Sequence, residues 1–530
     1  MPKKPASPLS VETKEYLVFD PSDVKKTVEI AVKAKPARED IEIIEKKGKV
    51  VRKKKTTAVK KEAPLLSKER DAAASKLGNY ILIITEKPQA AAKIAAALSN
   101  GNDRKINSHS GVSHYELVRD GKKIVVACAV GHLFTVSQTS KGTNYPQFNI
   151  GWFPNFEVNK KDFTKKYYMV IKKLAGEASD IIIATDFDVE GEVIGYNIMR
   201  FIAKRTDAKR MKFSSLTSQE LQESFDNVRP SIEWGQAIAG ETRHFVDWLY
   251  GINLSRAIMQ AIKSTGKFKL MSIGRVQGPA LKLIVDKEKE IQQFKSSLYW
   301  QIFATISDGK NTLELKYVKD ITKKDDLKKF DDLTGQKTLA TTTKTKQILL
   351  PPVPFDLSSL QTEAYKFHSL TPAQTLATAQ KLYLAGLISY PRTSSQKIPD
   401  AMKPLDILKK LKNHFEQTAH AIRTKPVEGN KTDPAHPAII PTGNFSHLEG
   451  ADKKLYELIV KRFIGCFCDN AELENKKVEI NPSVGKFSAR GMDILKKGWL
   501  SVYPAKMDET EIPDFTGEVS ITNIKIEEKE

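Results

Sequence analysis

The sequence has little cysteine and no long apolar run. Its three cysteines among 530 residues, at positions 128, 466 and 468, exclude a disulfide scaffold and a self-contained four-cysteine zinc ribbon, so we expect buried thiols. No segment approaches the roughly 18 consecutive apolar residues of a membrane-spanning helix. No apolar segment follows the basic N-terminus, so we expect no secretory signal either. The motif G-x-x-x-x-G-K-[ST] is missing, which argues against a P-loop ATPase.

The chain is strongly basic. Its 85 Lys and Arg residues outnumber 64 Asp and Glu residues, which gives a formal net charge of +21. Such an excess indicates a polyanionic partner, most often nucleic acid, although a solubilising surface would have the same sign. Hydrophobic residues make up 40% of the chain, and the length indicates several domains. We therefore expect a cytoplasmic, multidomain protein.

The first 75 residues differ from the rest. They hold 19 Lys and Arg against 12 Asp and Glu, a difference of +7, and include a basic run at 50–61. We expect a largely flexible cationic extension, with a small folded unit near 16–44 as an alternative. A phosphate-binding arm and a solvated linker both fit this composition.

Two α/β units follow. The apolar runs 80–85 and 180–185 are typical of strands buried on both faces, and each leads through a polar turn into a helix, at about 89–98 and 193–203. The first turn is Glu86-Lys87-Pro88 and the second is Asp186-Phe-Asp-Val-Glu-Gly-Glu192. Ligands of open parallel sheets bind at the carboxyl ends of the strands, where both turns lie.

The second turn predicts a metal site. Asp186, Asp188, Glu190 and Glu192 place four carboxylates within seven residues, and these repel one another unless a cation joins them. Hard oxygen ligands suit Mg²⁺. Glu190 and Glu192 alone also fit an acidic first helical turn, favoured by the helix dipole. Glu86, on a neighbouring strand, is a further ligand or a proton carrier.

The remaining chain alternates between helical and strand patterns. Residues 217–290 look helical, with a capping box at Thr217–Glu220, and residues 298–350 and about 476–530 look like strands. Two helices between 356 and 385 carry capping boxes at Ser358–Gln361 and Thr371–Gln374, and Gly386 fits the residue after the second helix. The following strand and turn indicate a helix-turn-helix or winged-helix layout.

Several isolated polar residues allow two interpretations each. Tyr390 is followed by Arg392, and a tyrosine hydroxyl beside an arginine can attack a phosphate, although a packed aromatic residue beside a loop is the plainer interpretation. His436 in a proline-rich turn is a structural residue or a phosphate donor. Arg275 fits a phosphate contact or a salt bridge equally well.

Together these segments resemble the type IA DNA topoisomerases. The residues in their motifs are most similar to those of archaeal topoisomerase I and topoisomerase III-like members. The match covers about residues 79–500, and its motifs follow the order of the family: Ile84-Thr-Glu-Lys-Pro88, Asp186-x-Asp-x-Glu-Gly-Glu192, Asp247-Trp-Leu-x-Gly-x-Asn-Leu-Ser-Arg256, Ser272-x-Gly-Arg-Val-Gln277, Leu387-Ile-Ser-Tyr-Pro-Arg-Thr-Ser394 and Ala435-His-Pro-Ala-Ile439. The sequence ends without the C-terminal zinc ribbons of many relatives. We expect residues 1–75 partly to replace their DNA-binding role.

The resemblance implies roles for these residues. Tyr390 would attack a DNA phosphodiester and leave a 5′-phosphotyrosyl link and a free 3′-hydroxyl, with help from Arg392, Glu86 and Lys87. The metal ligands for Mg²⁺ would be Glu86, Asp186, Asp188 and Glu190. The bound strand would be contacted by Arg256, Arg275, Gln277, Thr393, Ser394 and His436.

The resemblance also implies a fold: a multidomain α/β and α+β protein in which a Rossmann-like TOPRIM domain, helical and winged-helix-like domains and β-rich arch domains form a toroid. The expected domains are residues 1–75 (extension), 78–215 (TOPRIM), 216–292 with 444–475 (helical arch), 293–354 with 476–530 (β-rich arch) and 355–443 (winged-helix-like, carrying the tyrosine).

The implied enzyme is an ATP-independent isomerase that relaxes negative supercoils or decatenates DNA. It would be a nucleoid-associated monomer that prefers single-stranded or negatively supercoiled DNA, with a helicase or single-strand-binding protein as a candidate partner. Other readings are a topoisomerase subunit of a split reverse gyrase, a TOPRIM nuclease or primase, and a non-catalytic DNA-binding protein.

Overall fold

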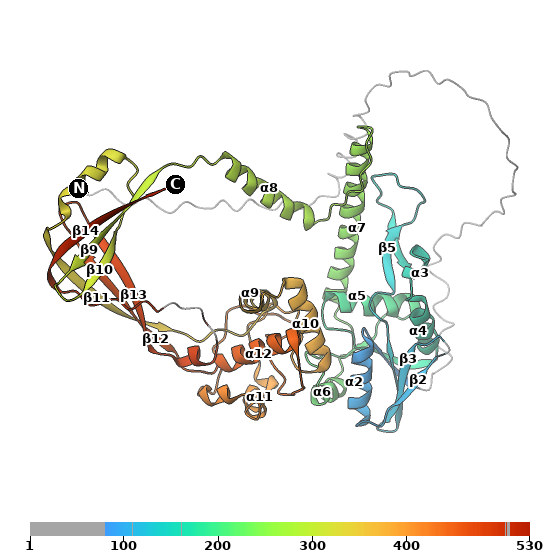
Figure 1. Cartoon of the computed structure of the whole chain (residues 1–530). Coiled ribbons are helices and arrows are strands. Elements are labelled where there is room, and N and C mark those ends of the chain that lie inside the picture. Colours follow the sequence, from blue (N-terminus) through green and yellow to red (C-terminus); the bar gives the residue numbers. More distant parts are fainter. Residues whose placement is uncertain (1–79, 109, 161, 504, 506–508) are drawn as a thin grey trace, which may run out of the picture. The chain divides into compact units, whose positions relative to one another are not determined.

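The computed structural model describes residues 80–530 except 109, 161, 504 and 506–508 (Figure 1). The expected basic extension, residues 1–75, lies outside the described residues. Among the helices that the structure describes, none is long and apolar enough to cross a membrane.

A six-stranded sheet forms the first α/β region. Its strand order is β2-β3-β4-β1-β7-β8, in which β1 lies parallel to both β4 and β7. The strands are β1 (Tyr80–Thr85), β2 (Arg104–Asn107), β3 (Ser113–Arg119), β4 (Lys122–Cys128), β7 (Ala178–Ile183) and β8 (Lys209–Arg210). Because β1 is central, its side chains at 82–84 are fully buried, as the continuous apolar run predicts.

Helices and a hairpin surround this sheet. The helices are α2 (Pro88–Ser99), α3 (Asn155–Val158), α4 (Lys165–Glu177), α5 (Val189–Asn197) with its π-helical continuation η1 (Ile198–Ile202), and α6 (Ser218–Asp226). The hairpin pairs β5 (Phe134–Gln138) with β6 (Ile150–Pro154). The two helices predicted after the acidic turns are confirmed, and the second begins four residues earlier than expected.

A long helix packs on α5. This helix, α7 (Trp234–Lys263), is followed by α8 (Gln277–Gln293). At Gly240 an added Cβ would lie 2.3 Å from a methyl group of Val193 and 2.8 Å from the carbonyl oxygen of Val189. Only glycine therefore permits the close approach of α7 to α5, which decides where the next turn of α7 lies.

The predicted strands close into a barrel, shown in yellow to red in Figure 1, with the order β10-β13-β12-β11-β14-β9. The strands are β9 (Tyr299–Ser307), β10 (Thr312–Tyr317), β11 (Lys337–Leu349), β12 (Ala471–Ile480), β13 (Phe487–Lys496) and β14 (Gly517–Lys529), with the 3₁₀ segments η2 (Lys324–Leu333) and η5 (Gly498–Ser501). The alternation predicted for β9 is confirmed, because Trp300, Ile302, Ala304 and Ile306 are all buried.

The helices between β11 and β12 form one packed unit. They are α9 (Leu357–His368), α10 (Pro372–Ala385), η3 (Asp400–Met402), α11 (Pro404–Leu411), η4 (Glu416–His420) and α12 (Gly450–Gly465). Residues 444–475 were expected with 216–292, but α12 packs on α9 and α10 and shares their core. Burial of its apolar face, which includes Leu455, Ile459 and Phe463, stabilises α12 in this position.

The helix caps differ at one point from the sequence pattern. The capping box at Thr371–Gln374 and the left-handed Gly386 are confirmed. The box predicted at Ser358–Gln361 is wrong, because Asp356 caps α9 and exchanges hydrogen bonds with Ser359. Asp356 also holds Lys431 at 2.8 Å, and this long-range contact favours the earlier start.

Candidate active site

The ends of β1 and β7 bring the two acidic turns together. Because the strands are adjacent and parallel, Glu86 and Lys87 lie beside Asp186. The Lys87 ammonium lies 3.0 Å from Oε1 of Glu86 and also forms an ion pair with Asp186. The adjacency predicted for these turns is thus observed, with a lysine cation between two carboxylates.

Tyr390 reaches the same place from the helical unit. Its hydroxyl donates a 2.5 Å hydrogen bond to Oδ2 of Asp188, 202 positions away in the sequence. The other carboxylate oxygen of Asp188 accepts the Gly191 amide at 2.7 Å and caps α5. A Cβ at Gly191 would lie 2.0 Å from the carbonyl oxygen of Asp186, so this turn requires glycine.

The electrostatics of the site follow from crowding and burial. Burial, and then the neighbouring Asp186, raise the pKa of Glu86; burial also raises the pKa of Asp186, against the opposing effect of Lys87. Burial would lower the pKa of Lys87, but the two carboxylates outweigh it and raise that pKa. The lysine is therefore charged, and the carboxylates favour any cation that enters.

The nucleophile candidate is buried and protonated. Tyr390 is 1% exposed. Burial, then the charges of Asp186 and Asp188, raise the pKa of its hydroxyl far above the usual range, while Arg392 acts in the opposite direction. The phenol therefore keeps its proton in this arrangement.

His436 links the two regions. Its Nε2 donates to the carbonyl oxygen of Phe187 at 2.9 Å, so its Nδ1 accepts from the hydroxyl of Ser214 at 3.1 Å. Its ring packs against Tyr390 with centroids 4.4 Å apart. Burial lowers the pKa of His436 to about 4. His436 was predicted to contact the bound DNA strand. In this structure both of its ring nitrogens are hydrogen-bonded to protein groups.

The residues after Tyr390 alternate in exposure. Arg392 is exposed, and no described acidic group pairs with it. Thr393 is buried, and its hydroxyl oxygen accepts the Ser395 amide at 3.0 Å. Ser394 is exposed and donates to Asp433 from its amide and its hydroxyl, at 3.2 and 3.1 Å. The predicted catalytic residue Arg392 and the predicted DNA contact Ser394 therefore face outward, whereas the predicted DNA contact Thr393 does not.

Glu192 points away from the site. It pairs with Nε of Arg210 at 2.6 Å, and both side chains are fully buried. Arg210 also donates to the carbonyl oxygens of Thr185 at 2.8 Å and Asp186 at 2.9 Å. This arginine holds the backbone of the acidic turn in place. No local pattern in the sequence predicts this role, because Arg210 follows a polar, charged segment at 204–209.

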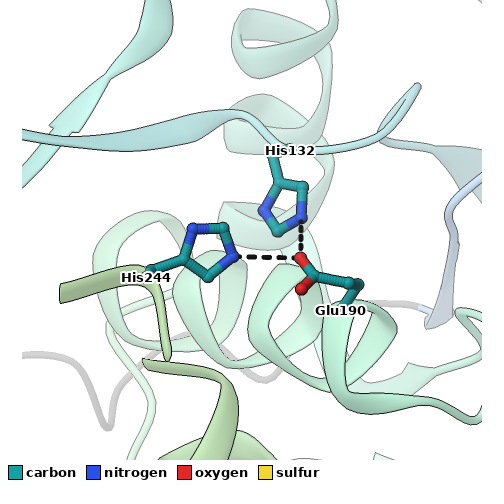
Figure 2. Close-up of side chains that lie close together, drawn as sticks. All are labelled: His132, Glu190 and His244. Carbon is teal, nitrogen blue, oxygen red and sulfur yellow. Dashed lines mark hydrogen bonds and ion pairs between the residues drawn. The ribbon is translucent and has the colours of Figure 1, made fainter. Parts of the chain in front are cut away.

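Glu190 points to a third place, shown in Figure 2. Its Oε2 accepts from Nε2 of His132 and Nε2 of His244, both at 3.0 Å. These bonds, that of His132 first, hold the pKa of Glu190 well below its usual range. Within the described ranges, these three residues are the one group of His, Cys or carboxylate ligand atoms that lie within 4.8 Å of one another. The structure thus separates Glu190 from Asp186 and Asp188.

The remaining predicted DNA contacts lie along α7 and the start of α8. Arg256 donates to Oε1 of Gln138 at 2.8 Å and to the carbonyl oxygen of Asn144 at 3.0 Å, beside an open pocket of about 690 Å³. Arg275 pairs with Asp247 at 2.7 Å, and Gln277 is exposed. None of the three joins Tyr390.

His132, His244 and Ser214 are site residues that the sequence patterns did not predict. His132 follows the end of β4, which is parallel to β1, so the rule used for the acidic turns points to it as well. His244 had no local signal. The three cysteines are buried and free, as expected.

Comparison with known families decides the relationship. A family model described as DNA topoisomerase matches residues 231–530, and a Toprim domain model matches residues 81–216. This chain belongs to the type IA DNA topoisomerase family. The predicted fold class, a Toprim domain with helical and β-rich regions, is confirmed. Toprim domains generally bind Mg²⁺.

Relatives in the family agree. DNA topoisomerase 1 of Methanocaldococcus jannaschii is 44% identical over 466 residues, which are 85% of this chain and 60% of that protein. DNA topoisomerase 1 of Pyrococcus horikoshii is 41% identical over 470 residues, covering 85% and 68%. The chain thus spans about three fifths to two thirds of the length of these relatives. The fold is similar to that of full-length topoisomerase I from Thermotoga maritima, with a TM-score of 0.64 at 24% identity over 84% of this chain and 72% of that one.

Proposed function

We propose that this chain is an ATP-independent type IA DNA topoisomerase: it cleaves one DNA strand transiently, lets another strand pass and rejoins the break. The observation that carries the proposal is the hydrogen bond from the Tyr390 hydroxyl to Asp188. The hydroxyl of the proposed nucleophile comes from one region and meets the Asp188 carboxylate of another, which supports a gate that opens between the two regions. The names of the relatives give no specific support to the split reverse gyrase alternative.

In the proposed reaction the Tyr390 oxygen attacks a phosphodiester. The new bond joins this oxygen to phosphorus, the bond from phosphorus to the 3′-oxygen breaks, and the phenolic proton passes to Asp188 along the existing hydrogen bond. The ester that forms keeps the energy of the phosphodiester, so rejoining needs no ATP. Since burial and carboxylates hold the proton on Tyr390, the tyrosine stays inert until a phosphate arrives.

Neighbouring side chains complete this chemistry. The raised pKa of Glu86 makes it the carboxyl group best suited to give a proton to the leaving 3′-oxygen and to take it back on rejoining. Lys87 holds a charged ammonium at the same point and would contact the phosphate. Arg392, exposed and free of acidic partners among the described residues, would stabilise the phosphoryl charge.

The donor set fits Mg²⁺. Glu86, Asp186 and Asp188 supply carboxylate oxygens, which Mg²⁺ prefers. Burial and then the neighbouring carboxylates raise the pKa values of Glu86 and Asp186, and a bound cation would oppose that repulsion. These three residues would hold the ion, and Glu190, whose carboxylate faces His132 and His244, would not. The ion would supply charge neutralisation of the phosphate.

The proposed substrate is DNA that is single-stranded or negatively supercoiled. The charge of +21 would attract it, and the outward Arg275, Gln277 and Ser394 would contact it, with Arg256 beside the pocket on α7. We propose a monomer, and a domain division in which residues 444–470 join the tyrosine-bearing unit because α12 packs there.

The test compares the wild type with Tyr390→Phe on negatively supercoiled plasmid, with Mg²⁺ and without ATP. The wild type should give ladders of relaxed topoisomers, and detergent added during the reaction should trap a covalent protein–DNA adduct. The variant should lose both activities by more than about 1000-fold, because phenylalanine has no nucleophilic oxygen.

Tyr383→Phe is a matched control, because this buried tyrosine packs against Tyr390 with centroids 5.2 Å apart and its hydroxyl forms no hydrogen bond within the part of the chain that the structure describes. It should keep relaxation and adduct formation. Relaxation by Tyr390→Phe at the wild-type rate would refute the assigned nucleophile. Binding without relaxation by the wild type would favour a non-catalytic DNA-binding role.

A further inference from the structure

Three elements converge on one carboxylate oxygen beside the active site. His132 comes from the loop after β4, Glu190 from the first turn of α5, and His244 from α7. Figure 2 shows both imidazoles pointing their Nε2 atoms at the same oxygen of Glu190, each at 3.0 Å. The two rings lie 5.0 Å apart between centroids.

We propose that His132, Glu190 and His244 bind a divalent transition-metal ion, with Zn²⁺ as the expected occupant. Two imidazole nitrogens and one carboxylate oxygen are a recurring ligand set for Zn²⁺, whereas Mg²⁺ prefers oxygen ligands. Zinc–nitrogen bonds of about 2.0–2.1 Å in a tetrahedral site separate neighbouring ligand atoms by roughly 3.3 Å. The observed separations of 3.0 Å between Glu190 Oε2 and each Nε2 are close to that value.

The backbone holds these residues in place. Gly240 permits the close contact of α7 with α5, and His244 lies four residues later on the same face of α7. On the other side, Val130 and Gly131 have φ values of 58° and 85°, which a β-branched residue such as Val130 rarely adopts. Val130 bends the chain so that His132 faces Glu190, and the cost of this conformation is consistent with a site rather than a plain turn.

The surrounding charges leave room for a cation. Arg243 is the lysine or arginine seen to pair with Glu190 among the described residues, and it lies 3.4 Å from Oε1, not from the oxygen that the histidines share. The Arg243 side chain is 56% exposed, so it can move away. The side chains of His132, Glu190 and His244 are 28 to 29% exposed, which gives an ion a path in and lets water supply a fourth ligand.

This site would differ from the Mg²⁺ site in ligands and role. It would tie α7 to the Toprim sheet and keep Glu190 away from Asp188, only two residues earlier. The proposal does not rest on the proposed function, since the ion contacts neither Tyr390 nor the carboxylates next to it.

The test measures Zn²⁺ binding to the full chain, untagged and stripped by a chelator, by isothermal titration calorimetry and by metal analysis after dialysis. The wild type should bind one Zn²⁺ per chain, and about a 100-fold excess of Mg²⁺ should not displace it. His132→Gln and His244→Gln should each weaken binding more than about 100-fold, beyond the effect of losing an outer-shell partner. His447→Gln, which removes an exposed imidazole 3.4 Å from a carboxylate oxygen of Glu449, should bind like the wild type.

A second measurement covers variants that fold poorly. Co²⁺ in place of Zn²⁺ should give the wild type the visible absorption of a tetrahedral site, and Asp188→Asn should keep that spectrum, since Asp188 belongs to the other site. Absence of stoichiometric Zn²⁺ binding, absence of the Co²⁺ spectrum in the wild type, or equal affinity of His244→Gln and wild type would each overturn the proposal.

Discussion

The two ends of one acidic turn differ more than their sequence indicates. Asp186 and Asp188 face a buried site with Lys87 and Tyr390, where carboxylates crowd together. Glu190, two residues later, faces two histidines at a surface where its side chain is 28% exposed, and Glu192 is buried against Arg210. Four carboxylates that look equivalent in the sequence thus have three different surroundings, and the partners decide what each can do.

The largest effect should come from breaking the buried ion pair between Glu192 and Arg210. Arg210→Met leaves the Glu192 charge without a partner and the carbonyl oxygens of Thr185 and Asp186 without a donor, which should cost about 3–5 kcal/mol of unfolding free energy. Urea unfolding followed by circular dichroism measures this. Arg229→Met, which breaks a half-exposed pair with Glu233, should cost less than about 1 kcal/mol. Equal losses in the two variants would show that Arg210 is not the support of the turn.

The next effect separates Asp188 from Glu190. Asp188→Asn keeps a side chain that can cap α5 but loses the charge that faces Tyr390, so DNA cleavage should fall about 100-fold, or roughly 2.7 kcal/mol. Glu190→Gln should lower cleavage less than about tenfold, because its carboxylate faces the histidines. Trapped adduct on a single-stranded oligonucleotide measures both. If Glu190→Gln and Asp188→Asn reduced DNA cleavage equally, Asp188 and Glu190 would belong to one functional site.

The smallest effect concerns pH at the contact between the two regions. His436 has a pKa of about 4 in the folded chain against 6.5 as its ordinary value. Its neutral ring therefore fits the fold fully above pH 6.5, and stability is lost as the pH falls from 6.5 toward 4. Between pH 7.0 and 5.5, the wild type should lose about 1 kcal/mol more than His436→Gln. Urea midpoints at the two pH values measure this difference, and parallel losses would contradict a buried neutral ring.

Local patterns in the sequence were enough for the strands, most caps and the meeting of Glu86 with Asp186. Buried parallel strands leave a clear signal, and their carboxyl ends must lie together. The partners of the Glu190 and Glu192 carboxylates were not predictable from such local patterns. Their partners His132 and Arg210 lie 58 and 18 positions away, and no local rule tells which face of a helix meets a distant histidine.

The cap of α9 teaches the same lesson on a smaller scale. Ser358–Gln361 has the spacing of a capping box, and so does Asp356 with Ser359. Asp356 is the cap because its carboxylate also accepts hydrogen bonds from Gln396 and Lys431, 40 and 75 positions away in the sequence. Local sequence patterns fit a helix start at either Asp356 or Ser358, and the tertiary contacts of Asp356 favour the first.

The barrel imposes an order on synthesis. Its strand β9 pairs with β14, and Trp300 bonds to Glu528 across 228 positions, so every residue from β9 to β14 must be synthesised before the barrel closes. The Toprim sheet, by contrast, is complete once Arg210 has emerged. While the residues between β11 and β12 are synthesised, β9 and β11 therefore have unpaired edges, which are prone to pair with other chains. A nascent chain stalled before residue 517 would already contain every residue of the acidic site. Its barrel would still be open, with unpaired strand edges that are prone to aggregate.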